Sequence, residues 1–215
     1  MLGLPASTEF NRRVSKQKIL ATVKMSAALE KKFSAQVESI HWRNIISTLT
    51  LNLAKGNYVK EIDIIEVQLR AEALDEKILR SLVKAIPNHI IFVLSRDGLY
   101  RLCAAFQDGS LDKNFFYTDW TSEDELTLCL NGLTLDEVYE NFIRQILGAE
   151  LSARSGESLR DFVERYARMK ALDRKVNVLR RKIRSEKQFN RRLEMNGELK
   201  ILLAELERLI GGSVG

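Results

Sequence analysis

Two carboxylates and an amide lie close together in the apolar segment 59–69, and they are the residues best suited to metal-dependent chemistry. Asp63, Glu66 and Gln68 are interspersed there with isoleucine and valine. Mg²⁺-dependent nucleases can place an aspartate on one strand and a Glu-x-Lys triplet on the next, so that carboxylates bind the metal and the lysine helps to activate water. Here position 68 is glutamine instead of lysine, and the segment 49–53, which we expect to be the preceding strand, offers no carboxylate.

This incomplete set leaves three interpretations of Asp63, Glu66 and Gln68: a functional nuclease site, a decayed nuclease scaffold, or the solvated polar face of a strand. Charged residues on half-buried strands normally face water, which favours the last interpretation. We therefore predict no catalytic residue, no metal and no cofactor.

Other residue types that carry chemistry lack partners at a suitable spacing. His41 and His89, the only histidines, are far apart, and the sequence contains no phosphate-binding glycine loop and no nucleophile elbow. Cys103 and Cys129 have no histidine partners for zinc, and we expect both to be small buried apolar side chains in a cytoplasmic protein. Uncharged apolar runs such as 90–94 are too short to cross a membrane.

The periodicity of apolar residues predicts an α/β (α+β) fold, with a mixed β-sheet and packed helices. Helices are expected at 8–13, 15–23, 26–40, 74–86 and 135–147. Strands are expected at 49–53, 59–69, 89–94, 99–106 and 115–117. Within 59–69 the apolar positions shift phase, which indicates either a bulge or a strand that is buried on both faces.

A separate helical tail is predicted at 156–210, after a globular domain at 1–149. Its apolar residues step by three and four with one stammer, as in a coiled coil. This association seam consists of Phe162, Tyr166, Met169, Leu172, Val176, Leu179 and Ile183, followed by Leu199, Leu202 and Leu206. The stretch 188–190 is the least periodic, so we expect a helical hairpin that turns there, with one long helix as the alternative. The seam must be covered by the globular domain, the second tail helix, another copy or a partner.

The positive charge of the chain lies in this tail. The net charge is +5, but residues 151–215 contain 16 Lys and Arg against nine Asp and Glu. Candidate nucleic-acid contacts are Arg165, Arg168, Lys175, Arg180, Arg181, Lys182, Arg184, Lys187, Arg191 and Arg192. The alternative is a solvated or protein-binding face, because long Lys and Arg side chains also cover the edges of such seams.

Several segments resemble one prokaryotic family, domain of unknown function 4391. They are residues 4–11, 54–77, 117–120, 138–142 and, in the tail, 186–196. Members of that family are often encoded beside DNA methyltransferases and helicases of restriction-like systems. The resemblance implies an association with DNA modification or anti-phage defence, and it implies no particular reaction.

The sequence thus predicts a non-enzymatic adaptor or accessory subunit of such an assembly, whose amphipathic tail mediates protein association. The expected partner is a protein, such as a methyltransferase or helicase, or a second copy of the chain. The alternatives are a DNA- or RNA-binding protein that uses the basic tail, and a divergent or decayed Mg²⁺-dependent nuclease-like domain. No membrane partner is expected.

Overall fold

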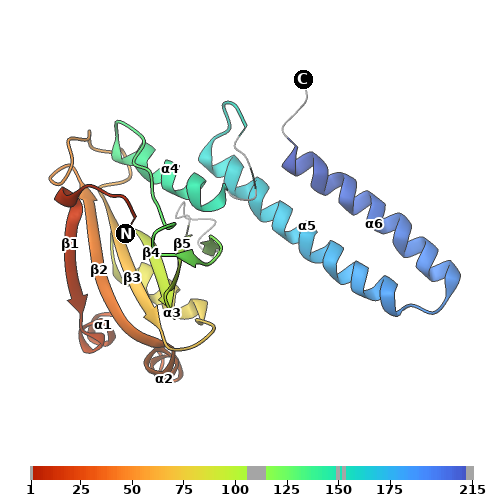
Figure 1. Ribbon diagram of the computed structural model, residues 1–215, viewed down its shortest axis with the longest axis horizontal. Helices are drawn as coiled ribbons and strands as arrows, with labels where there is room; N and C mark the ends of the chain where they lie inside the picture. The colour runs from red at the N-terminus through yellow and green to blue at the C-terminus, as the bar shows by residue number, and fades with distance from the viewer. Residues whose placement is uncertain (1, 106–114, 149–150, 152–153, 212–215) are drawn as a thin grey trace. The chain divides into compact units, whose positions relative to one another are not determined.

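The computed structural model describes residues 2–105, 115–148, 151 and 154–211 of the chain. These residues divide into two compact units, Met1–Ile146 and Leu147–Gly215. The first unit is built on a mixed β-sheet and the second is a pair of helices, which confirms the predicted fold class (Figure 1). Within the described residues, no helix is both long enough and apolar enough to cross a membrane.

The sheet has seven strands in the described residues, in the order β1-β2-β3-β4-β5-β6, with β7 also paired to β5. The strands are β1 (Glu9–Val14), β2 (Val37–Ser47), β3 (Glu61–Leu69), β4 (His89–Arg96), β5 (Leu99–Ala105), β6 (Phe115–Tyr117) and β7 (Thr121–Ser122). Only β3 and β4 pair in parallel. A parallel pair needs a crossover connection, and helix α3 (Glu76–Ala85) supplies it.

Helices cover both faces of this sheet. On one face, α1 (Lys16–Thr22), α2 (Ala27–Gln36) and α3 contribute to a buried apolar cluster with side chains such as Val67 and Phe92. On the other face, α4 (Leu135–Leu147) reaches the start of β4, where the rings of Tyr139 and His89 lie 4.5 Å apart. Strand β3 is therefore buried on both faces, which accounts for the phase shift in its apolar pattern.

Three predictions of secondary structure in the first 55 residues were wrong. The expected helix at 8–13 is a short 3₁₀ turn, Ala6–Thr8, followed by strand β1. The helix expected at 26–40 ends at Gln36, and the chain continues directly into β2, which pairs with β3. Long-range pairing with β3 thus overrides the helical periodicity that Val37 and Ile40 share with the residues before them.

The strand expected at 49–53 is a turn. The hydroxyl of Thr50 accepts a hydrogen bond from the backbone N–H of Ser47 at 3.0 Å and donates one to the carbonyl of Ile45 at 2.8 Å. These local bonds end β2, and Leu49 projects into solvent with 95% of its surface exposed. The returning strand begins only at Glu61.

The two cysteines differ in environment. Cys103 lies in β5 and is buried, as predicted, whereas Cys129 is exposed, so the prediction for Cys129 was wrong. Cys129 lies outside the sheet, in a segment held by the side chain of Gln145, which bonds both its backbone N–H and its carbonyl at 2.8 Å.

The second unit contains the predicted helical hairpin. Helix α5 (Leu159–Ser185) and helix α6 (Phe189–Ile210) lie side by side and antiparallel (Figure 1). The chain turns at 186–188, close to the predicted position, so the alternative of one long helix was wrong. The side chain of Ser158 caps α5 by accepting a hydrogen bond from the N–H of Asp161.

Candidate functional site

The residues that suggested metal chemistry do not come together in the structure. The pairing of β3 with β4 is continuous from Ile62 to Gln68. Since side chains alternate along an unbroken strand, Asp63 and Glu66, three residues apart, lie on opposite faces of the sheet. Glu66 and Gln68 share one face, and Asp63 lies on the face that α1, α2 and α3 cover.

Glu66 is nearly buried, and both of its carboxylate oxygens have partners. Its Oε2 accepts a hydrogen bond from Nε of Arg43 at 2.6 Å, with the Nη2 atom of the same guanidinium at 2.5 Å. Its Oε1 accepts a hydrogen bond from the hydroxyl of Ser95 at 2.7 Å. The guanidinium thus supplies the positive charge that a metal ion would bring to this carboxylate.

Irregular backbone in the neighbouring strands positions this network. The register of β2 against β3 shifts between Trp42 and Asn44, which makes Arg43 the extra residue of a bulge. On β1, the register shifts between Glu9 and Arg12, where Asn11 adopts a left-handed backbone with φ of 43°. The bulges lie beside a pocket of about 270 Å³ on the Glu66 face. Its lining includes Asn11, His41, Arg43, Glu66, Gln68 and Tyr100.

Gln68 is also engaged within the sheet, because its Oε1 accepts a hydrogen bond from the hydroxyl of Ser39 at 2.8 Å. The other carboxylate of the pocket, Asp97, pairs with Nε of Arg96 at 3.2 Å. Among the described residues, no group of three or more His, Cys, Asp or Glu side chains is placed to hold a metal ion. The pocket is therefore a polar, internally paired surface.

Asp63 belongs to a separate buried cluster, on the face of the sheet that α1, α2 and α3 cover. The amide of Asn88 donates to Oδ2 of Asp63 at 3.1 Å and to Oε1 of Glu61 at 2.6 Å. The other oxygen of Asp63, Oδ1, is buried without a hydrogen-bond partner among the described residues, and so is the indole nitrogen of Trp42. Burial raises the pKa of Asp63 to about 7, and the nearby carboxylate of Glu61 adds to the rise.

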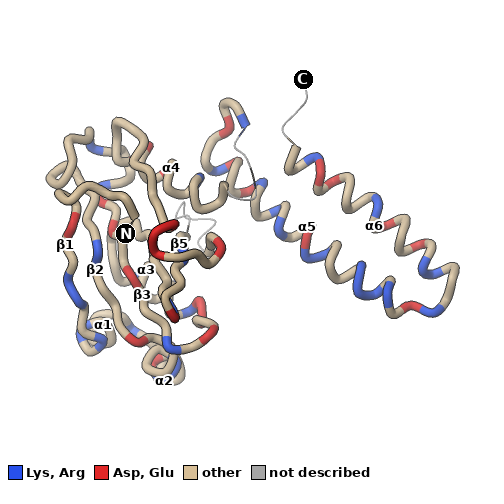
Figure 2. The backbone as a smooth tube through the Cα atoms, viewed as in Figure 1, with Lys and Arg blue, Asp and Glu red and all other residues tan. Residues whose placement is uncertain are grey.

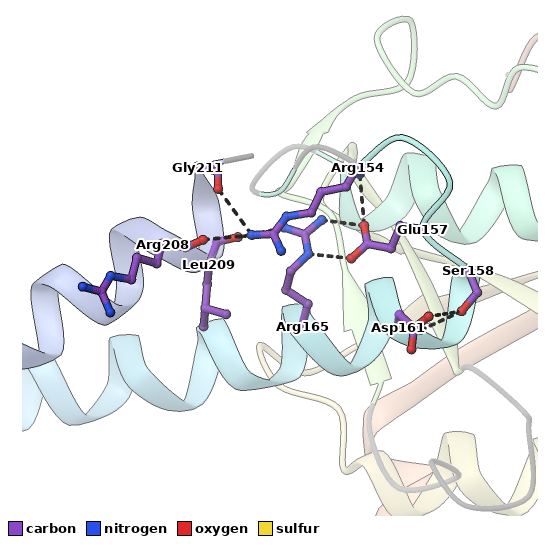
Figure 3. Close-up of polar contacts among 8 residues, drawn as sticks. All are labelled: Arg154, Glu157, Ser158, Asp161, Arg165, Arg208, Leu209 and Gly211. Atoms are coloured by element: carbon purple, nitrogen blue, oxygen red, sulfur yellow. Dashed lines mark hydrogen bonds and ion pairs between the residues drawn. The ribbon is translucent and has the colours of Figure 1, made fainter. Parts of the chain in front are cut away.

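In the helical unit, a pair of arginines fastens the end of α6 to α5 (Figure 3). The guanidinium of Arg165 binds both carboxylate oxygens of Glu157 at 2.7 Å and also donates to the carbonyl of Leu209 at 2.8 Å. Arg154 donates to the carbonyls of Arg208 at 2.8 Å and Gly211 at 3.3 Å. The last carbonyls of α6, which have no partners within the helix, are thus satisfied by two cations. We call this group, Arg154, Glu157 and Arg165 with the end of α6, the arginine clasp.

The clasp removes Arg165 from the candidate nucleic-acid contacts, because its side chain is buried in an ion pair. Arg168 also has a partner, since its Nη2 lies 2.5 Å from the carboxylate of Glu205 on α6. The remaining candidates are exposed on α5, at the turn or at the start of α6: Lys175, Arg180, Arg181, Lys182, Arg184, Lys187, Arg191 and Arg192.

The predicted association seam lies largely inside the protein. On α5, Phe162, Tyr166, Met169, Leu172, Val176 and Leu179 are buried, and Ile183 is half-buried. On α6, Leu199, Leu202 and Leu206 are half-buried. Leu202 and Leu206 lie on the same side of α6 as Leu209, whose carbonyl contacts α5. These residues therefore hold the hairpin together.

The chain was compared with known protein families, curated proteins and solved structures. A family model described as "Domain of unknown function (DUF4391)" matches residues 2–206, which is nearly the whole chain. The chain belongs to the DUF4391 family. The resemblance seen in the sequence is thereby confirmed. No curated protein and no solved structure matches this DUF4391 chain.

Sequence reasoning missed Arg43, Ser95, Arg154 and Glu157. Arg43 and Ser95 reach Glu66 across two different strand pairings, so finding them required the register of the sheet. Arg154 and Glu157 lie in the segment before α5. The backbone N–H of Arg154 donates to Glu157, and Glu157 in turn accepts a hydrogen bond from Arg165 on α5, so the conformation of this segment decides the contact. A signal that could have located them is the capping pattern of Ser158 with Asp161, which marks the start of α5. Residues just before such a cap lie beside the first turn of the helix.

Proposed function

We propose that this DUF4391 chain is a non-enzymatic adaptor, an accessory subunit of a DNA-modification or restriction-like assembly, and that its helical hairpin mediates protein association. The observation that carries the proposal is the outward face of α6. No residue of this helix is buried, although it is rich in leucine and isoleucine. An exposed apolar helix face is typical of a surface that another protein covers.

The surface proposed for association, which we call the α6 stripe, is Leu193, Gly197 and Ile201. These residues recur at every fourth position, so they lie on one side of the helix. Leu193 is 63% exposed and Ile201 is 71% exposed. Gly197, at the centre of the stripe, lies nine positions from Leu206, roughly 180° around the helix from the side that packs on α5. The space above Gly197 is open, because a Cβ atom added to this glycine would meet no neighbour within 4 Å, so a partner helix could approach closely there.

The polar pocket of the sheet supports the non-enzymatic part of the proposal. Both oxygens of Glu66 are used by Arg43 and Ser95, and Gln68 is bound to Ser39. Mg²⁺-dependent cleavage would need Glu66 to leave a charge-assisted ion pair and a second free carboxylate on the same face. The rival nuclease interpretation therefore requires a rearrangement of the sheet face.

Association can be tested with the methyltransferase and helicase subunits that the family resemblance implies as neighbours. The full chain would be mixed with each subunit, and also measured alone, by size-exclusion chromatography with light scattering. We expect a complex with one of these proteins or a dimer of the chain itself. Leu193→Asp combined with Ile201→Asp should weaken that complex at least tenfold, because charged groups would be buried in it.

Val178→Asp is the matched control, because Val178 is also an exposed apolar residue, 51% exposed, but lies on α5. It should leave the complex unchanged. The proposal is wrong if the chain stays monomeric and unbound with every subunit, or if the control variant weakens the complex as much as the α6 variant does.

A further inference from the structure

The cations of the hairpin fall into two groups with different surroundings. Near the open end of the hairpin they have acidic or carbonyl partners: Arg154 and Arg165 in the clasp, Arg160 with Glu164, and Arg168 with Glu205. Toward the turn, within the part of the chain that the structure describes, the cations make no ion pair. Figure 2 shows these basic segments gathered along the second half of α5 and around the turn.

The few acidic residues near the turn do not neutralise this group. Asp173 accepts a hydrogen bond from the side chain of Asn177 at 3.1 Å, and Glu186 accepts one from the backbone N–H of Gln188 at 2.9 Å. Both carboxylates stay charged, but they are two acids among the nine Lys and Arg residues between 173 and 192, and no ion pair joins them to these cations in the described part of the hairpin. The clustered cations repel one another, and this repulsion is relieved by an anionic ligand or by mobile counterions.

The cations form two regular ridges on the outer side of α5. Arg174 and Arg181 are seven residues apart, and so are Lys175 and Lys182, so each pair repeats after two turns, about 10 Å along the axis. All four residues are exposed. Arg174 and Arg181 lie on the side of α5 opposite the buried Val176. Lys175 and Lys182 lie between that side and the buried Leu179, three or four residues from it in the sequence.

Between the ridges lie residues with short side chains: Ala171, Val178 and Ser185, again at intervals of seven. We call this surface, the two ridges and the short residues between them, the α5 basic face. Its apolar area comes from Val178, with half of its surface exposed, and from the small side chain of Ala171. A protein interface normally has a core of buried apolar and aromatic side chains and few lysines, so this face does not fit a protein partner.

We propose that the α5 basic face binds the phosphodiester backbone of nucleic acid. A backbone presents closely spaced charges and needs no apolar anchor, and its neutralisation by Lys and Arg releases condensed counterions. Contacts from Lys and Arg to phosphates carry no sequence information, so this contact is independent of base sequence. The inference goes beyond the proposed adaptor function, because it assigns a second ligand to a different side of the hairpin from the α6 stripe.

The test is fluorescence anisotropy of the full chain with short labelled DNA duplexes and single strands of DNA and RNA. If about four to five phosphates are neutralised, affinity should fall on the order of a hundredfold between about 50 and 200 mM salt. Reversing the ridges with Arg174→Glu, Lys175→Glu, Arg181→Glu and Lys182→Glu should weaken binding at least tenfold at the lower salt concentration. Circular dichroism confirms that each variant keeps its helices.

A matched control separates the α5 basic face from net charge alone. Lys200→Glu with Arg208→Glu reverses two exposed cations on α6 and should be compared with Arg174→Glu with Arg181→Glu, which makes the same change in net charge. The control should weaken binding less than threefold. Equal weakening by both pairs, binding that does not depend on salt, or binding to polyglutamate as tight as to nucleic acid would each overturn the proposal.

The outcome is also independent of the association test. Leu193→Asp with Ile201→Asp should leave nucleic-acid affinity unchanged, and the ridge variants should leave the protein complex unchanged. Loss of protein association therefore leaves the nucleic-acid proposal standing, and the reverse also holds. Loss of nucleic-acid binding in the α6 variant would show that the two sides of the hairpin do not act separately.

Discussion

At the scale of single residues, the two carboxylates of β3 have opposite environments. Glu66 is nearly buried but fully paired, with a guanidinium on one oxygen and a hydroxyl on the other. Asp63 is fully buried, and the amide of Asn88 donates to one of its oxygens. Its other oxygen has no hydrogen-bond partner at bonding geometry among the described residues, although the indole of Trp42, likewise unpaired, is close enough to favour the charged form. Burying an unpaired charge is costly, and the charge on Asp63 therefore disfavours folding.

The first prediction concerns this cost. The pKa of Asp63 is raised to about 7, so between about pH 4 and pH 7 the folded state holds a proton that the unfolded state has lost. Stability should therefore fall as pH rises through this window and level off above it. Asp63→Asn removes the titrating group and should raise stability at pH 8 by about 1–3 kcal/mol.

Urea unfolding of the wild type and of Asp63→Asn at a series of pH values measures this effect. Glu61→Gln is a useful companion, because it removes the neighbouring carboxylate and should lower the pKa of Asp63. If the difference in free energy of unfolding between the wild type and Asp63→Asn is the same at pH 4 and pH 8, or if Asp63→Asn is destabilising at pH 8, the account of this cluster is wrong.

The positions of these residues show how much of the site could be predicted from the sequence. The period of a strand alone separates Asp63 from Glu66, because residues three apart face opposite sides. The partners of Glu66 could not be found that way, since Arg43 reaches it only through an extra residue in β2. A bulge depends on long-range pairing, so the sequence indicates which residue types are present but not which of them meet.

At the scale of elements, helices with regular apolar spacing were predicted well. The expected helices at 74–86 and 135–147 correspond to α3 and α4, and the turn of the tail lies within two residues of its expected place. In the first 55 residues, the helix expected at 15–23 corresponds to α1, but the segments 8–13, 37–40 and 49–53 were predicted wrongly. Their local patterns compete with strand pairing and with side-chain hydrogen bonds at turns. The segment 37–40 illustrates the competition, since it fits a helix locally and is a strand in the sheet.

The arginine clasp is the element that determines how the hairpin closes. The Arg165 and Glu157 side chains are 6% and 9% exposed, so the pair is held away from water. Arg165 also lowers the pKa of Glu157, and the stability this provides should be lost as pH falls below the normal range of glutamate. A buried ion pair that loses one partner leaves an uncompensated charge.

The second prediction follows from the clasp. Arg165→Met should destabilise the protein by about 3 kcal/mol, because Glu157 and the carbonyl of Leu209 lose their donor. The double variant Arg165→Met with Glu157→Gln should recover part of this loss, since no unpaired charge then remains. Thermal unfolding followed at the helical circular dichroism signal checks both variants.

Arg160→Met is the control for the clasp. Arg160 pairs with Glu164 on the exposed surface of α5, and such a pair contributes little to stability. We expect a change below about 0.5 kcal/mol. The clasp would lose its structural role if Arg165→Met were as mild as this control.

At the scale of the whole molecule, charge and apolar surface are divided among different parts of the chain. Residues 1–150 contain 18 Lys and Arg against 20 Asp and Glu, whereas the hairpin contains the excess of positive charge. Within the hairpin, the α5 basic face and the α6 stripe lie on different helices. This division supports an adaptor that holds a protein with one helix and nucleic acid with the other.

The structure changes which residues we propose for the two contacts of such an adaptor. The apolar seam, expected to meet a partner, is mostly buried in the structure, and the exposed apolar residues of α6 belong to a different face of that helix. Of the candidate arginines, Arg165 is buried in an ion pair with Glu157, whereas Arg168 pairs with Glu205 on the surface and stays exposed. An amphipathic pattern identifies a face that must be covered, and only the folded structure shows whether the protein covers it itself.

The most direct test of the central proposal, an adaptor without nuclease activity, is a cleavage assay. The purified full chain would be incubated with labelled duplex DNA, single-stranded DNA and RNA in the presence of Mg²⁺ or Mn²⁺, and product lengths would be compared with those of Glu66→Gln. Because Glu66 is held by Arg43 and Ser95, we expect no shortening by either protein. Metal-dependent cleavage by the wild type that disappears in Glu66→Gln would contradict the account and establish the sheet pocket as an active site.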